Sequence, residues 1–99
     1  MSLEPLEPGE AGVQAARERL EAAGVEPYAW SNGPGDQYAA HEHRTNKLLI
    51  CAEGSITFLV GPDERPVELS AGDGLVLPAG TRHAAVVGPD GCTCLEGHR

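Results

Sequence analysis

The stretch GDQYAAHEHRTNKLLICAEG, residues 35–54, carries the strongest signal for the fold of this chain. It contains His41 and His43, which a single residue separates. Because side chains alternate between the two faces of a β-strand, both imidazoles are expected to point the same way, roughly 6–7 Å apart. Imidazole binds Zn, Cu, Fe and Ni, so two imidazoles that converge from one strand predict half of a metal site.

A second stretch, GDGLVLPAGTRHAAVV at residues 72–87, adds a third histidine. Together the two stretches resemble the paired motifs of the cupin superfamily, which read G-x5-H-x-H-x3 or 4-E-x6-G and G-x5-P-x-G-x2-H-x3-N. The two departures are Lys47, where the motif has glutamate, and Val87, where it has asparagine. All other fixed positions match, with the spacing intact: Gly35, His41, His43, Gly54, Gly72, Pro78, Gly80 and His83.

This resemblance implies an all-β fold, an antiparallel jelly-roll (double-stranded β-helix) barrel. It also implies that the two motifs face each other across the barrel and bring His41, His43 and His83 within reach of one divalent ion, such as Zn, Ni, Mn or Fe. In the family the motif glutamate is usually the fourth ligand of that ion. Since Lys47 stands at that position, the usual set of three histidines and one glutamate is not expected here.

Lys47 is the candidate catalytic residue, and three roles remain open for it. A charged ammonium about 4 Å from a divalent ion would cost on the order of 8 kcal/mol at an effective dielectric of 20, so it is not expected beside the ion. Lys47 either turns aside to pair with a carboxylate such as Glu53 or Glu42, or is neutral and acts as a general base or amine nucleophile. In the third alternative no metal binds, and Lys47 with the histidines holds a carboxylate or phosphate.

The N-terminal part is expected to form an arm and one helix. Two Glu-Pro steps within residues 1–10 are typical of an extended arm. A helix is predicted near residues 10–23, because Val13, Ala16 and Leu20 recur at helical spacing on one face and Gly24 can end it. We therefore divide the chain into the arm and helix at residues 1–26 and the barrel at residues 27–99.

Residues 27–99 are expected to contain about eight or nine short strands. Thirteen glycines and eight prolines in 99 residues indicate many turns. In this region Trp30 is interpreted as a core residue, Cys51 as a small buried hydrophobe and His98 as inert. The strands are predicted at residues 27–32, 37–43, 47–52, 55–60, 67–69, 75–77, 82–87 and 92–96.

Composition limits the partners and the location. A net charge of -8 and a pI near 4.8 argue against nucleic acid and anionic membrane surfaces. No apolar run approaches the roughly 18 residues of a spanning helix, and the acidic N-terminus does not resemble a secretory or transit peptide. Three cysteines do not form a disulfide framework, so a cytoplasmic protein with free thiols is expected. The small core and the need to cover edge strands predict a homodimer.

The function expected from these patterns is that of a small cupin that binds a divalent metal through the three histidines and handles a small polar or anionic ligand. Isomerase, lyase and oxygenase chemistry all recur on this fold, and the fold does not choose among them. The alternative is a non-catalytic binding or sensing module without metal, in which Lys47 and the histidines hold an anionic ligand. The loss of the motif glutamate favours this alternative. An oligomerisation scaffold is disfavoured, because three inward histidines are costly to bury without partners.

Overall fold

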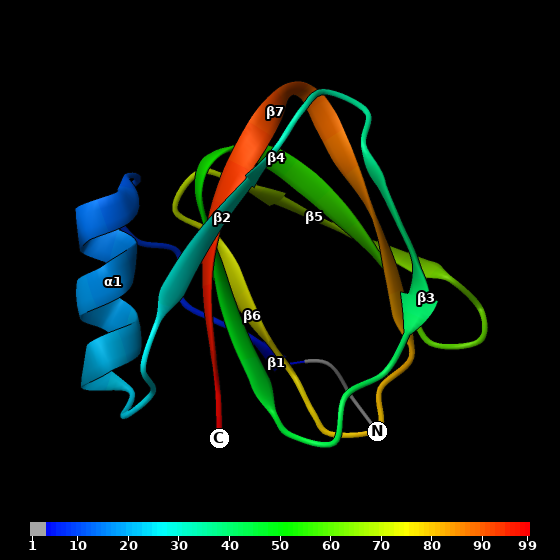
Figure 1. Cartoon of the computed structure of the whole chain (residues 1–99), viewed down its shortest axis with the longest axis horizontal. Helices are drawn as coiled ribbons and strands as arrows, with labels where there is room; N and C mark the ends of the chain where they lie inside the picture. Colours follow the sequence, from blue (N-terminus) through cyan, green and yellow to red (C-terminus); the bar gives the residue numbers. More distant parts are fainter. Residues whose placement is uncertain (1–3) are drawn as a thin grey trace.

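The computed structural model describes residues 4–99, so residues 1–3 of the expected arm lie outside the described part of the chain. Figure 1 shows the strands rolled into a barrel with the helix on the outside, and every strand pair within the described residues is antiparallel. The elements are β1 (Glu4–Pro5), α1 (Val13–Ala22), β2 (Tyr28–Asn32), β3 (Gln37–His41), β4 (Lys47–Val60), β5 (Arg65–Ser70), β6 (Gly74–Leu77) and β7 (His83–His98). The expectation of an all-β jelly-roll barrel with one N-terminal helix is confirmed.

The expected number of strands was wrong, because β4 and β7 are long strands that each bend and continue. The strands predicted at residues 47–52 and 55–60 are both parts of β4, and those at residues 82–87 and 92–96 are both parts of β7. Glycines with positive φ lie at the bends, 73° at Gly54 and 78° at Gly91. The pairing of β4 with β7 shifts register on either side of Gly54, so the glycine marks an irregularity within a strand rather than its end.

The bend in β4 leads to a testable prediction. A Cβ at Gly54 would lie 2.0 Å from the carbonyl oxygen of Gly91, so the two strands cross too closely for a side chain. Gly54→Ala is expected to lower the free energy of unfolding by about 2–3 kcal/mol, from the left-handed backbone and the clash together. Gly61→Ala is the matched control, because Gly61 has a φ of 80° but no atom within 4 Å of the added Cβ. If urea unfolding gave the same loss of stability for Gly54→Ala and Gly61→Ala, the close approach of the two strands at Gly54 would be contradicted.

Two apolar clusters lie on the two faces of the rolled sheet. The barrel interior contains Leu49 and Phe58 together with the free thiols Cys51, Cys92 and Cys94. The interpretation of Cys51 as a buried hydrophobe is therefore confirmed.

The second cluster joins the outer face of the sheet to α1, and Ala16 and Leu20 of the predicted helical stripe are at most 1% exposed. The helix begins at Val13, later than predicted, and Gly24 follows its end with a φ of 84°. Because the stripe is buried against the sheet, the helix covers the barrel from outside.

The arm lies along the edge of the sheet. β1 pairs with β6, so residues 4 and 5 extend the sheet. Within residues 4–99 no helix is both long and apolar enough to cross a membrane. The division of the chain at residues 26 and 27 and the homodimer stay predictions.

Candidate metal centre

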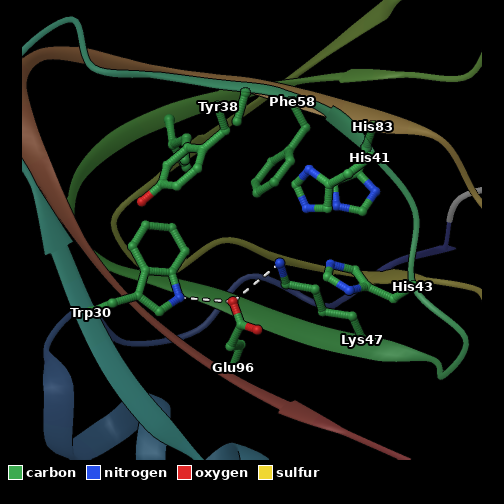
Figure 2. A pocket seen from close by; sticks show the side chains of 10 residues that line it. Trp30, Tyr38, His41, His43, Lys47, Phe58, His83 and Glu96 are labelled. Carbon is green, nitrogen blue, oxygen red and sulfur yellow. Dashed lines mark hydrogen bonds and ion pairs between the residues drawn. The ribbon is translucent and has the colours of Figure 1, made fainter.

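Three histidines meet at one end of the barrel interior (Figure 2). His41 is the last residue of β3, His43 follows it in the connection to β4, and His83 is the first residue of β7. One nitrogen of each ring lies within 4.8 Å of the other two. His41 and His83 are register partners across the β3–β7 pair, which brings the two motifs together. The predicted strand at residues 37–43 ends at His41, so the connection rather than strand alternation directs His43 inward.

Backbone hydrogen bonds fix how two of the rings present their nitrogens. Nδ1 of His41 lies 2.8 Å from the Ala39 carbonyl oxygen, and Nδ1 of His83 lies 2.9 Å from that of Thr81. A carbonyl oxygen only accepts, so each Nδ1 carries the hydrogen and donates it. In a neutral ring this leaves a lone pair on Nε2, which is the arrangement of a metal-binding histidine.

Two ring nitrogens of the cluster lack a partner. Among the described residues, Nε2 of His43 and Nε2 of His83 are buried without any hydrogen bond. Buried polar atoms are normally satisfied, so two orphaned nitrogens that face the same space indicate a missing ligand. The three imidazoles therefore fit a divalent ion.

Burial favours the neutral, metal-binding form of two of the imidazoles, those of His43 and His83. Desolvation lowers the pKa of His83 to about 4, although the backbone bond to Thr81 partly opposes it. Burial also lowers the pKa of His43, with the nearby Lys47 ammonium acting in the same direction. Since a metal must displace any proton on the ligand nitrogen, low pKa values allow metal to be held in mildly acidic solution.

The buried histidine also predicts an acid-sensitive fold in the metal-free protein. Below pH 6.5 the unfolded chain binds a proton on His83, but the folded protein does not until pH is about 4. Stability is thus fully present above pH 6.5 and is expected to fall by about 2–3 kcal/mol as pH decreases to 4. His83→Phe should remove most of this slope in urea unfolding with chelator present. An unchanged slope would show that His83 does not cause it.

Lys47 turns aside and pairs with a carboxylate that sequence analysis did not single out. Its Nζ lies 3.1 Å from Oε1 of Glu96, and both side chains are less than 10% exposed. Of the three roles left open for Lys47, the structure shows the pairing with a carboxylate, but the suggested partners were wrong, because Glu42 and Glu53 are exposed at the surface.

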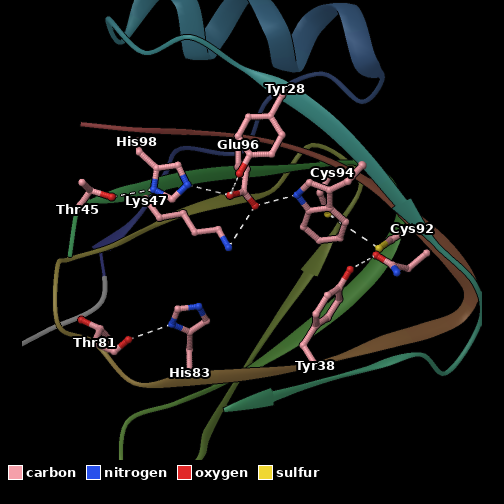
Figure 3. Close-up of polar contacts among 12 residues, drawn as sticks. Tyr28, Tyr38, Thr45, Lys47, Thr81, His83, Cys92, Cys94, Glu96 and His98 are labelled. Carbon is pink, nitrogen blue, oxygen red and sulfur yellow. Dashed lines mark hydrogen bonds and ion pairs between the residues drawn. The ribbon is translucent and has the colours of Figure 1, made fainter. Parts of the chain in front are cut away.

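Glu96 is the buried centre of a polar network that extends to the surface at Tyr28 (Figure 3). Besides Lys47, it accepts hydrogen bonds from the Tyr28 hydroxyl at 2.6 Å and from Trp30 Nε1 at 2.8 Å, and Nε2 of His98 lies 3.0 Å away. Burial by itself would raise the pKa of the Glu96 carboxyl, but the Tyr28 hydrogen bond and the Lys47 charge outweigh it and lower the pKa. Glu96 therefore remains ionised.

One signal could have revealed Glu96. Glu96 follows Cys92 and Cys94 at a spacing of two residues, so the three side chains share one face of the strand. Because the two cysteines face the barrel interior, the carboxylate of Glu96 is directed inward as well. His98, interpreted from the sequence as inert, also joins this network, and its functional role stays untested. Its Nδ1 lies 2.9 Å from the Thr45 hydroxyl, and its ring packs 5.5 Å from that of His43, centroid to centroid.

The three histidines and the Lys47–Glu96 pair line one cavity of about 250 Å³. The imidazoles form one end and the Trp30 and Tyr38 rings form the other, while Phe58 and the ion pair lie between them (Figure 2). Trp30, interpreted from the sequence as a core residue, is only half-buried and forms part of the cavity wall. The lining residues are Trp30, Tyr38, His41, His43, Lys47, Ile56, Phe58, His83, Ala85 and Glu96.

Comparison with known proteins gives matches over most of the barrel. The family described as Cupin domain matches residues 30–95. Dimethylsulfoniopropionate lyase DddW of Ruegeria pomeroyi is 37% identical over 59 residues, which cover 60% of this chain and 38% of that protein. This chain thus spans well under half the length of that relative.

Solved structures agree on the fold. Dimethylsulfoniopropionate lyase DddQ of Ruegeria pomeroyi matches with a TM-score of 0.68 and 24% identity, over 76% of this chain and 38% of that one. An RmlC-like cupin of Shewanella frigidimarina matches with a TM-score of 0.65 and 24% identity, over 75% of this chain and 64% of that one. At these identities the likeness shows the barrel architecture.

Proposed function

This chain belongs to the cupin family, and on that premise we propose that it binds one divalent metal ion through His41, His43 and His83 and a small carboxylate ligand beside it at Lys47. The observation that carries the proposal is that Nε2 of His43 and Nε2 of His83 are buried without a partner among residues 4–99, at one end of a cavity whose wall also holds a lysine. Zn, Ni, Mn and Fe all accept imidazole ligands, so the donor set does not select one of them.

Lys47 supplies the charge that favours a carboxylate. An ammonium has three hydrogen-bond donors, and Glu96 is its one partner among the described residues. The remaining donors of Lys47 face the cavity, where a carboxylate can accept them in a charge-assisted bond. A divalent ion held by the three imidazoles would act as a Lewis acid on the same carboxylate.

We further propose that the activity is that of a lyase. The support is the 37% identity to a protein named dimethylsulfoniopropionate lyase, which extends over 38% of that protein. The reaction to test converts dimethylsulfoniopropionate into dimethyl sulfide, acrylate and a proton. In it Lys47 would orient the carboxylate, and the aromatic end would keep water from the carbon that loses its substituent.

The metal-free alternative has one observation in its favour, which is Lys47 at the position of the family glutamate. The geometry of His83 argues against it. Because its Nδ1–H is bonded to the Thr81 carbonyl and its pKa is about 4, its Nε2 is an acceptor and cannot donate to an anion. Lys47 would then be left to hold the anion with little help.

Metal analysis of the protein purified without an affinity tag tests the proposal directly. We expect one equivalent of a divalent transition metal, retained on gel filtration and removed by chelator. A protein that takes up no stoichiometric Zn, Ni, Mn or Fe but still binds small carboxylates would support the metal-free module instead. The homodimer, the cytoplasmic location and the lack of nucleic-acid or membrane partners remain predictions from composition.

Replacing Lys47 separates its two possible effects on the site. Lys47→Gln keeps a hydrogen-bond donor for Glu96 but removes the charge, so carboxylate binding is expected to weaken about 10- to 100-fold while metal binding stays intact. Lys47→Glu should tighten metal binding by adding the family's fourth ligand, and should abolish carboxylate binding. Calorimetric titration of each variant with metal and then with propanoate measures both. Unchanged propanoate binding by Lys47→Gln would remove Lys47 from the ligand site.

A further inference from the structure

The end of the cavity opposite the histidines is built from aromatic and aliphatic side chains. Trp30 of β2 and Tyr38 of β3 form its walls, and Phe58 of β4 lies between them and the imidazoles (Figure 2). Ile56 and Ala85 also line the cavity, and Ala85 is the register partner of both Tyr38 and Phe58. The Trp30 and Tyr38 rings meet edge to face with centroids 5.7 Å apart. We call these five residues the apolar end.

The hydrogen-bond donors of the apolar end are already used within the protein. Trp30 Nε1 donates to Glu96, and the Tyr38 hydroxyl donates to the side chain of Asn32. Ile56, Phe58 and Ala85 have no polar side-chain atoms. The Tyr38 oxygen also points away from the imidazoles (Figure 2).

The neighbouring carboxylate offers no further acceptor. A carboxylate has about four lone-pair positions, and Glu96 receives four donors, two on each oxygen. A ligand hydroxyl or ammonium packed against the side chains of the apolar end would lose part of its water and gain no full replacement. Such an unpaired buried group is costly, whereas a methyl group at the same place is favourable.

Building on the proposed carboxylate site, we infer that the ligand of this cavity is a short carboxylate whose other end carries no O–H or N–H, either a branched alkyl group or a fully alkylated onium group. The cavity of about 250 Å³ is smaller than a typical drug-sized site, which limits the tail to a few atoms. Sugar acids and acids with a hydroxyl remote from the carboxylate are disfavoured, because they would place that hydroxyl at the apolar end. Aromatic faces accept alkyl groups and alkylated cations alike.

An isosteric series of carboxylates tests the inference in the metal-loaded protein. The probes are 4-methylpentanoate, dimethylsulfoniopropionate, 4-hydroxypentanoate and 4-ammoniopentanoate, which share the propanoate part and differ in the branched end. By isothermal calorimetry the two methylated probes are expected to bind about 10- to 100-fold more tightly than the hydroxyl and ammonium probes. The ratio of the dissociation constants of 4-methylpentanoate and dimethylsulfoniopropionate shows whether the cavity prefers an alkyl or an onium tail.

A pair of serine variants provides the matched control. Ala85→Ser places a hydroxyl in the cavity wall, whereas Ala84→Ser adds one to the opposite face of β7, outside this cavity. Ala85→Ser should shrink the preference for 4-methylpentanoate over 4-hydroxypentanoate several-fold, and Ala84→Ser should leave it unchanged. Neither change removes a side chain that packs the barrel, so both variants are expected to fold.

The outcomes separate this inference from the proposed function. If all four carboxylates bind with equal affinity, the carboxylate site stands and the inference about the tail is wrong. Tighter binding of 4-hydroxypentanoate overturns it as well. If none of the four binds although metal is held, the carboxylate site itself is wrong and the inference fails with it. A preference for methylated probes that Ala85→Ser reduces and Ala84→Ser does not is the supporting result.

Discussion

Glu96→Leu is expected to lower the free energy of unfolding by about 3–5 kcal/mol, because it leaves a buried ammonium without its counter-charge. Lys47 lies 3.1 Å from this carboxylate and is less than a tenth exposed, so water replaces the lost counter-charge only poorly. The Tyr28 hydroxyl and Trp30 Nε1 lose their acceptor at the same time. For a domain of this size such a loss corresponds to a decrease of at least about 10 °C in the melting temperature.

A double-mutant cycle identifies the cause of this loss. Lys47→Met combined with Glu96→Leu removes both charges and leaves apolar side chains of similar length, so the double variant should recover much of the stability that Glu96→Leu loses. Urea unfolding of the wild type, the two single variants and the double variant gives the coupling free energy. A double variant less stable than Glu96→Leu would show that Tyr28 and Trp30, rather than Lys47, are the partners that matter.

The barrel and the three histidines could be predicted because their signals are local in the sequence. The spacing of His41, His43 and His83 relative to the flanking glycines can be read directly from one sequence, and these positions carry the family resemblance. Conversely, the predicted strand ends were wrong where a glycine allows a strand to bend rather than to end in a turn. Gly54 and Gly91 resemble ends of strands, but their positive φ allows β4 and β7 to cross closely and continue.

The partner of Lys47 could not be found in this way, because it depends on the register between two distant strands. In the β4–β7 pair, Lys47 lies opposite His98 and Leu49 lies opposite Glu96. Lys47 therefore reaches Glu96 diagonally across the pair, a contact that long side chains can span. Sequence proximity suggested Glu42 and Glu53, whereas the fold supplies a carboxylate from β7. The charge that replaced the family glutamate is thus balanced by a carboxylate on the neighbouring strand.

His83→Phe is expected to weaken divalent metal binding by more than about a hundredfold. Loss of a hydrogen bond that supports a ligand lowers metal affinity about 10- to 100-fold, and loss of the ligand itself should lower it further. Phe fills a similar volume in a position that is 2% exposed, so the fold should be retained. His98→Asn is the matched control. It removes an imidazole that packs against His43 but lies outside the group of three, and it should hold metal nearly as the wild type does.

Titration of metal-free wild type, His83→Phe and His98→Asn with Zn at pH 7 measures the effect. The three imidazole nitrogens lie within 4.8 Å of one another, so a single ion can contact them together and each should contribute to its affinity. Equal, strong binding by wild type and His83→Phe would show that the metal sits elsewhere. Because Phe also removes the buried group that opposes protonation, His83→Phe should lose metal and gain acid stability together. These two effects have one cause, an imidazole that the barrel keeps neutral and unpartnered on Nε2.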